Sequence, residues 1–113
     1  MKPGDILLVK FPFSDLASTK KRPAMLLAHA SRSPRNRLVT VAMITSKVES
    51  LGYSGDVLLQ HWEHAGLLHP SLLRLGKVAT LDANLVEGTI GELSRGDLRR
   101  AKTAFRQVFA AWK

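Results

Sequence analysis

Three short motifs in this sequence combine residues that could bind or act on a phosphate. The first is Arg22-Pro23, in which the proline biases the arginine toward extended geometry and so fixes the point from which its planar guanidinium reaches out. The second is Thr45-Ser46-Lys47, two hydroxyls and a cation at the end of an apolar run. The third is Arg74-Leu75-Gly76-Lys77, whose glycine lets the backbone approach a ligand between two cations. For each motif the alternative is a solvent-exposed segment without a ligand.

Other catalytic or metal-binding chemistry has little support in the sequence. There is no cysteine, which excludes thiolate ligands, thiol nucleophiles and disulfides. Three histidines cluster near Glu63, but their spacing differs from the zinc-hydrolase helix motif, whose ligands stand four residues apart. These are His61, His64 and His69. We therefore expect no metal and no other cofactor. His29 lies in an apolar run and is predicted to pack in the core, and the nine acidic residues form no recognisable catalytic pair.

Strands followed by one helix would position these motifs. Apolar and β-branched runs predict strands over residues 6–9, 24–28, 38–44, 56–60, 72–81 and 89–93. The first run is continuously apolar, so we expect it to be covered on both faces and to end at Pro12. Gly76 predicts a β-bulge within its strand. The polar segments 14–21, 31–37 and 47–55 are predicted loops, and 61–68 a short helix or turn.

The last segment has the pattern of an amphipathic helix. Ser94 is a predicted N-cap, and Asp97 stands where the acid of a capping box would be. Apolar residues then recur at helical spacing, at Leu98, Ala101, Phe105, Val108, Phe109 and Trp112. We predict that this helix lies on the sheet, and that residues 1–113 form a single domain.

The chain is strongly basic. Lys and Arg total 17 against 9 Asp and Glu, a net charge of +8, which favours polyanionic partners. Five of these net charges fall within residues 95–113, where the alternative is the solvated face of the helix. No apolar run approaches the roughly 18 to 20 residues of a membrane helix, and the first residues lack a signal-peptide pattern. The absence of cysteine fits a reducing cytoplasm.

Taken in order, the motifs resemble the PemK/MazF toxins of bacterial toxin–antitoxin pairs. The resemblance covers most of the chain, from about Gly4 to the start of the helix. It rests on Gly4-Asp5-Ile6, Phe11-Pro12-Phe13-Ser14-Asp15, Lys21-Arg22-Pro23-Ala24, Ile44-Thr45-Ser46, Asp56-Val57-Leu58-Leu59, Ser71 to Lys77 and Thr80-Leu81-Asp82. The fold it implies is mainly β, a small SH3-like barrel over about residues 4–93 with a C-terminal amphipathic helix over about 95–112. It also implies a homodimer.

The function that the resemblance implies is that of a cytoplasmic bacterial or archaeal endoribonuclease. Such a toxin cleaves single-stranded mRNA at short sequences without a metal, and a small acidic cognate antitoxin neutralises it and joins it in DNA binding. The reaction centre maps onto Arg22 and Thr45. The residues expected to assist or to bind RNA are Ser46, Arg74, Lys77, Lys21, Lys20 and Lys47. The expected step is attack of a ribose 2′-hydroxyl on the adjacent phosphate, which leaves a cyclic phosphate and a free 5′-hydroxyl.

One position departs from the family pattern. Some relatives carry an acid, proposed as the base, where this chain has Gly76. Either this subgroup works without that carboxylate, or a histidine or Asp15 takes its place. Two other functions stay open. A non-catalytic toxin of the same fold would poison DNA gyrase through protein contact, although it would have no need of Arg22 and Thr45. A plain RNA-binding barrel would show exposed aromatics for base stacking, of which the sequence offers few.

Overall fold

A computed structural model describes residues 1–11 and 20–112 of the chain. Pro12 and Asp15, predicted as a strand end and as a candidate base, lie outside the described residues. Within the described part, six strands precede one α-helix: β1 (Asp5–Phe11), β2 (Lys20–Ser33), β3 (Asn36–Thr45), β4 (Asp56–Leu58), β5 (Leu72–Asp82), β6 (Val86–Glu92) and α1 (Arg95–Val108). Two 3-10 turns are also present, η1 (Val48–Ser50) and η2 (Ala83–Leu85).

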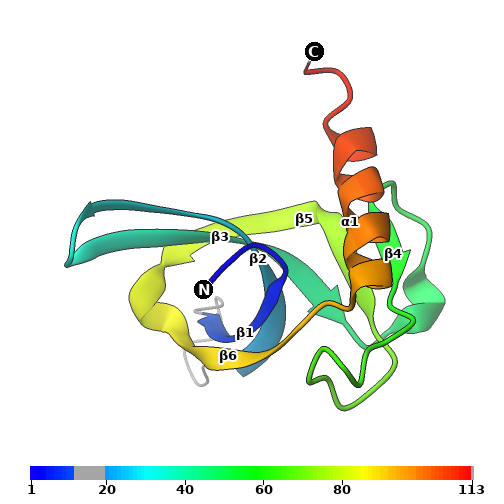
Figure 1. Cartoon of the computed structure of the whole chain (residues 1–113), viewed down its shortest axis with the longest axis horizontal. Helices are drawn as coiled ribbons and strands as arrows, with labels where there is room; N and C mark the ends of the chain where they lie inside the picture. Colours follow the sequence, from blue (N-terminus) through cyan, green and yellow to red (C-terminus); the bar gives the residue numbers. More distant parts are fainter. Residues whose placement is uncertain (12–19, 113) are drawn as a thin grey trace.

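The strands form one antiparallel sheet in the order β4-β5-β3-β2-β1-β6 (Figure 1). The mainly β fold with a C-terminal helix is therefore confirmed. β1 and β6 curl away from the plane of β3 and β5, which gives the sheet its barrel-like shape (Figure 1). Within the described residues the edge strands β4 and β6 do not pair with each other, so hydrogen bonding leaves the barrel open.

The sheet separates two hydrophobic clusters. Ile6 packs in the cluster that also contains Met25 and the α1 residue Ala101. Leu7 and Val9 belong to the second cluster, on the other side of the sheet. Because successive side chains of a strand point to opposite faces, β1 contributes to both clusters. This confirms that the continuously apolar run is covered on both faces.

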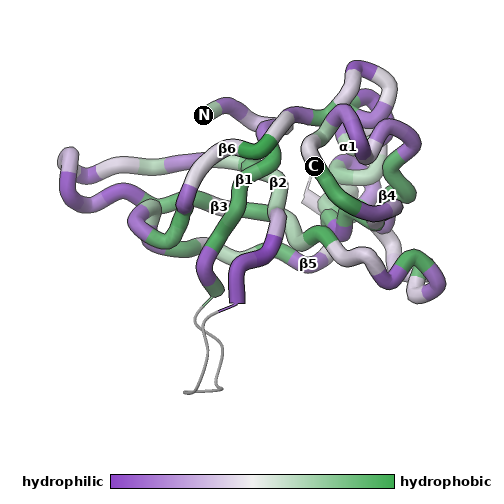
Figure 2. Tube along the Cα trace, turned by 90° about the horizontal axis from the view of Figure 1, so that it is seen from below, coloured by the Kyte–Doolittle hydropathy of each residue, from purple (hydrophilic) through white to green (hydrophobic). Residues whose placement is uncertain are grey.

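The strands of the β2–β3 hairpin are longer than the sequence predicted. Lys20 and Lys21, placed in a loop by the sequence, pair with β1 at the start of β2. At the other end, the hairpin projects away from α1, and its tip is largely hydrophilic (Figures 1 and 2). His29 lies in this projecting part and is exposed, so the prediction of a core histidine is wrong. Cross-strand hydrogen bonds extend the hairpin beyond the region that the core covers.

The helix α1 begins as predicted but buries a narrower face. The Ser94 hydroxyl accepts a hydrogen bond from the Asp97 backbone N–H (3.1 Å), and the helix ends at Val108 rather than near residue 112. Only small side chains of the stripe, such as Ala101, are buried. The aromatic residues Phe105, Phe109 and Trp112 are 41%, 38% and 88% exposed, because the end of α1 extends beyond the sheet (Figure 1). No helix among the described residues is long and apolar enough to cross a membrane.

Asp97 turns inward instead of completing a capping box. Its side chain is 1% exposed and accepts backbone N–H bonds from Gln60 (3.1 Å) and His61 (2.9 Å), as well as a bond from Arg100. Burial acts to raise the pKa of this carboxyl, but the two backbone donors and the Arg100 guanidinium outweigh burial and lower it. Asp97 thereby ties the segment after β4 to the first turn of α1.

We predict that Asp97→Asn lowers the free energy of unfolding at pH 7 by about 2 to 4 kcal/mol, because an amide cannot replace the charge that three donors surround. The pKa of Asp97 is lowered in the folded state. The contribution of Asp97 to the free energy of unfolding is therefore complete above its unfolded-state pKa, and it is lost as the pH falls through its folded-state pKa. Urea unfolding between pH 2.5 and 7 should therefore show the two proteins converging below about pH 4. A difference in the free energy of unfolding between the wild type and Asp97→Asn that stays constant with pH would contradict this role. Glu63→Gln, at an exposed acid, serves as the control.

Candidate functional site

A cleft of about 720 Å³ lies where β2 begins and β3 ends. Six of the eight predicted site residues line it, namely Lys20, Lys21, Arg22, Thr45, Ser46 and Lys47. The rest of the lining comes from the segment 66–71, with Leu8 of β1 and Ile90 of β6. Residues that are more than twenty positions apart in the sequence thus meet at one end of the sheet.

The cleft opens because β2 and β3 part at Pro23. The last β2–β3 pair at this end is Ala24 opposite Met43. Pro23, which directly precedes Ala24 in the chain, has no N–H to donate. Beyond this point β2 stays paired with β1, where Arg22 stands opposite Val9. β3 stays paired with β5 as far as Thr45. Arg22 and Thr45 are therefore each two residues past the last common pair, one on each side of the opening.

The hydroxyl groups of the cleft stand on ordered backbone. Thr45 closes β3 opposite Leu72, and its Oγ1 accepts a hydrogen bond from the Lys47 backbone N–H (3.2 Å). This bond turns the chain directly after Ser46 and brings Lys47 into the cleft lining. The predicted motif of two hydroxyls and a cation is thus one turn, in which strand pairing fixes the first hydroxyl.

Positive charge dominates the cleft. Its described lining contains four cationic side chains and no carboxylate. Just outside, Glu87 of β6 pairs with Lys21 (Nζ–Oε2 3.0 Å) and Lys10 (Nζ–Oε1 3.3 Å). The hydrogen bond from Lys21 is the main reason that the pKa of Glu87 is lowered. This pairing partly offsets the charge of Lys21.

The structure places the other two predicted residues elsewhere. The Arg74 guanidinium lies beside the loop after β3, where Nη2 donates to the Ser50 carbonyl (3.0 Å) and to the Ser50 hydroxyl. It also lies 5.2 Å from the Tyr53 ring centre, and its Nε is 3.9 Å from Asp56 Oδ1. Lys77 is exposed and does not line the cleft. Arg74 therefore holds a loop whose first residue is the cleft lysine Lys47.

Gly76 forms the predicted bulge, but the backbone that approaches it is the protein's own. β3 pairs Ala42 with Val78 and Met43 with Arg74, which leaves three extra residues on β5. A side chain at Gly76 would meet the Ser54 carbonyl oxygen at 3.0 Å. The glycine thus lets the 52–55 loop pack closely against β5. The backbone of this loop, and not a ligand between two cations, occupies the space beside Gly76.

Sequence reasoning missed the segment 66–71 as part of the cleft. His69 and Ser71 both line it. The segment is held against β6 at Gly66 (φ +81°), where a Cβ would overlap the Ile90 carbonyl oxygen. On the β6 side of the same contact, a Cβ at Gly91 would overlap the Ala65 carbonyl. The two glycines are the sequence signal of this contact, but their separation of 25 positions hides it.

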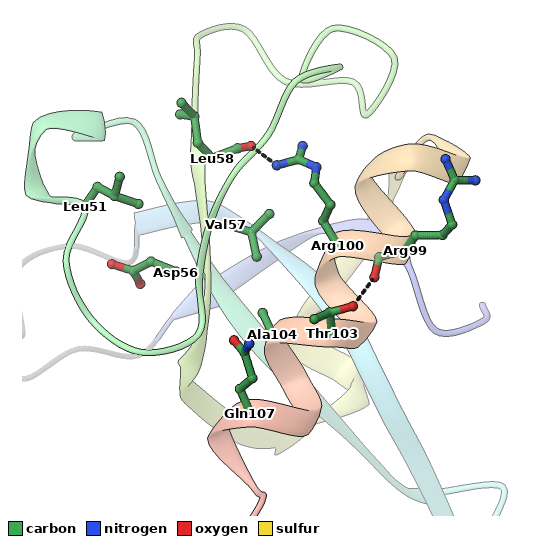
Figure 3. Close-up of a pocket in the computed structure, with 9 residues that line it drawn as sticks. All are labelled: Leu51, Asp56, Val57, Leu58, Arg99, Arg100, Thr103, Ala104 and Gln107. Carbon is green, nitrogen blue, oxygen red and sulfur yellow. Dashed lines mark hydrogen bonds between the residues drawn. The ribbon is translucent and has the colours of Figure 1, made fainter.

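A second cavity, of about 450 Å³, lies between β4 and α1 (Figure 3). Several of its polar side chains have partners inside the fold. Arg100 donates to the Leu58 carbonyl (2.9 Å), and Asp56 Oδ2 accepts from the Gly52 and Tyr53 N–H groups (3.1 and 3.0 Å). Across residues 1–11 and 20–112, no three His, Asp or Glu side chains are grouped so that they could hold a metal ion. The cleft at Arg22 is thus the better candidate site.

Comparison with known proteins agrees with this fold. The family model described as "PemK-like, MazF-like toxin of type II toxin-antitoxin system" matches residues 2–109. Among solved structures, the Mycobacterium tuberculosis toxin MazF-mt6 is similar, with a TM-score of 0.71 and 24% identity over 94% of this chain and 96% of that one. An endoribonuclease in complex with its cognate antitoxin from a mycobacterial species has a TM-score of 0.70 and 14% identity, over 97% of this chain and 95% of that one. MazF from Deinococcus radiodurans has a TM-score of 0.66 and 17% identity, over 97% of this chain and 96% of that one. None of the curated proteins matches the chain.

We predict that Arg74→Ala lowers the free energy of unfolding by about 1 to 3 kcal/mol, because it leaves the buried Asp56 carboxylate without its nearby cation. Chemical denaturation of Lys77→Ala provides the matched control on the same strand, with an expected change of less than about 0.5 kcal/mol because Lys77 is exposed. If Arg74→Ala matched this control in stability but bound RNA more weakly, Arg74 would act on RNA directly.

Proposed function

The chain belongs to the PemK-like, MazF-like toxin family of type II toxin–antitoxin systems, and we propose that it is a sequence-specific endoribonuclease that cleaves single-stranded mRNA. The observation that carries this proposal is the cationic cleft in which Arg22 and Thr45 face each other across the opening between β2 and β3. A solved structure similar to this chain is described as an endoribonuclease in complex with its cognate antitoxin, which supports the same activity for this chain.

The proposed step is attack of a ribose 2′-oxygen on the adjacent phosphorus. As the new P–O bond forms and the bond to the 5′-oxygen breaks, negative charge accumulates on the phosphate oxygens. The Arg22 guanidinium, with its fork of N–H donors, supplies hydrogen bonds and charge to these oxygens. The Thr45 hydroxyl holds a phosphate oxygen in the reacting geometry. The products are a 2′,3′-cyclic phosphate and a free 5′-hydroxyl.

The remaining cleft residues would bind the RNA chain on either side of the cut. Lys20 and Lys21 precede Arg22 on β2, and Lys47 follows Ser46, so cations flank both sides of the reaction centre. Contacts from lysine to phosphate position a nucleic acid without reading its sequence. Ser46 can bond to a ribose hydroxyl, a group that DNA lacks. In this proposal side chains supply all the positive charge, so cleavage requires no metal ion.

We also propose that a small acidic antitoxin neutralises the protein. An acidic, partly disordered segment that folds as it binds would complement the cationic cleft and exclude RNA from it. The toxin–antitoxin complex described above supports a partner of this kind. A homodimer that acts in the cytoplasm, and that binds DNA together with its antitoxin, completes the proposal.

Arg22→Ala should reduce RNA cleavage by about 10²- to 10³-fold, the usual cost of removing one donor to a developing oxyanion. Arg22→Lys should restore the charge but little of the rate, because an ammonium group cannot form the two parallel bonds of a guanidinium. The measurement is cleavage of single-stranded oligoribonucleotides of varied sequence by purified protein in the presence of a chelator.

Arg32→Ala is the matched control for this experiment, since Arg32 is an exposed arginine at the far end of the same strand. Its cleavage rate should equal that of the wild type. If the wild-type protein left every RNA intact but still inhibited growth, the non-catalytic toxin would replace this proposal. If cleavage persisted unchanged in Arg22→Ala, the reaction centre would lie elsewhere.

RNA affinity should fall steeply with salt. For single strands, each phosphate neutralised contributes a slope of about −0.7 to the plot of log affinity against log salt concentration. Lys47→Ala should therefore make the slope less negative by about 0.7 while weakening binding to all sequences alike. Fluorescence anisotropy with an RNA that carries 2′-deoxyribose at the cleavage position, measured between about 50 and 300 mM salt, tests this. An unchanged slope would mean that Lys47 does not contact phosphate.

A further inference from the structure

The segment 66–71, which lines the cleft together with Arg22, carries one imidazole. His69 lies directly before Pro70, and the buried Ser71 hydroxyl donates to the His69 carbonyl (2.8 Å). The segment is anchored on its other side where Gly66 packs against the backbone of β6. The His69 backbone is therefore held at a defined place, while its side chain is exposed in the cleft.

The chemistry of the other lining groups makes this imidazole distinctive. The described cationic groups of the cleft are ammonium groups and a guanidinium, which ionise well above neutral pH as residue types and are poor proton acceptors at pH 7. The hydroxyls of Thr45, Ser46 and Ser71 are equally unsuited to accept a proton and keep it. Imidazole is the side-chain type that changes its charge between pH 5 and 8. Among the described lining residues, His69 alone carries an imidazole.

We propose that His69 is the catalytic base, which accepts the proton of the ribose 2′-hydroxyl; this inference rests on the proposed ribonuclease function. In the step, the 2′-O–H proton passes to the neutral imidazole as the 2′-oxygen bonds to phosphorus. The bond between phosphorus and the 5′-oxygen breaks, and that oxygen takes a proton from water. The imidazolium returns its proton to the resulting hydroxide, so charge and atoms balance.

Some relatives carry an acid, proposed as the base, at the position of Gly76. The surroundings of Gly76 in this structure favour a different source of the base. Gly76 does not line the cleft, and a side chain at this position would press against the Ser54 carbonyl. A carboxylate on this part of β5 would therefore be directed toward the 52–55 loop, among groups that Asp56 and Arg74 already bind. The described part of β5 thus supplies no acid to the cleft, whereas His69 lines it.

The charged groups around His69 are all cationic in the described lining. β2 contributes Lys20, Lys21 and Arg22, the turn after β3 contributes Lys47, and the facing residues of β1 and β6 are the apolar Leu8 and Ile90. Glu87 lies behind Lys21 and is bound to it. A base must be neutral to act, so the proposal requires that cleavage rise with pH through the ionisation of an imidazole and then level off.

The test is a single-turnover pH–rate profile of purified wild type and His69→Ala, from pH 5 to 8.5, on a single-stranded oligoribonucleotide with chelator present. We expect His69→Ala to lose about 10²- to 10⁴-fold in rate and to lose the rise with pH between 5 and 8. Added imidazole should restore part of the rate. Affinity for the same oligonucleotide with 2′-deoxyribose at the cleavage position should change less than about twofold, which separates proton transfer from RNA binding.

His64→Ala is the control, because His64 is an exposed histidine in the preceding turn and does not line the cleft. It should keep both the wild-type rate and the wild-type pH profile. If His69→Ala kept them too, or lost affinity instead of rate, His69 would not be the base, while the ribonuclease function would stand. The same holds if Asp15→Asn, and not His69→Ala, removed the rise with pH. Wild-type protein that cleaves no RNA would overturn the proposed function itself.

Discussion

β2 and β3 are paired by hydrogen bonds along the hairpin, and this pairing ends at Ala24, directly after Pro23 in the chain. From there each strand stays paired only with its outer neighbour, β1 for β2 and β5 for β3. A shift of one residue in the hairpin would turn the core side chains to the wrong face, so burial of the core holds the register in place. The positions of Arg22 and Thr45 depend on the same register. The core that stabilises the sheet thereby determines which two residues stand at its open end.

The few acidic side chains of this basic protein are used mainly to hold its loops and edges together. Asp97 accepts backbone N–H bonds from the segment after β4, and Asp56 accepts them from the loop before it. Asp5 pairs with Lys2, and burial, which acts to raise its pKa, is outweighed by the bonds from Lys2, so the pKa is lowered. Glu87 ties β6 to Lys10 of the adjacent strand β1 and to Lys21 of β2. Because these carboxylates are engaged elsewhere, the described lining of the cleft stays cationic.

Local patterns in the sequence predicted the strands, the start of α1, the bulge at Gly76 and four of the residues that line the cleft, and the family resemblance added Lys20 and Lys21. Each of these features depends on near neighbours, through alternation, capping or a proline. The features that the sequence did not reveal depend on contacts between distant segments. The approach of Gly66 to Gly91 brings His69 into the cleft, and the Ser50 carbonyl engages Arg74. Nothing next to Asp97 in the sequence shows that it also accepts bonds from the backbone of residues 60 and 61.

The distribution of charge separates the affinity of the proposed enzyme from its selectivity. The basic segment from residue 95 onward does not line the cleft, so the high net charge says little about the site. The lysines and the arginine in the cleft would bind the phosphates of DNA as readily as those of RNA. The ribose 2′-hydroxyl distinguishes the backbone of RNA from that of DNA, and the groups suited to interact with it are uncharged hydroxyls and an imidazole. In the proposed function, therefore, the cations and Thr45 hold the phosphates of the strand, and Ser46 and His69 determine that this strand must be RNA.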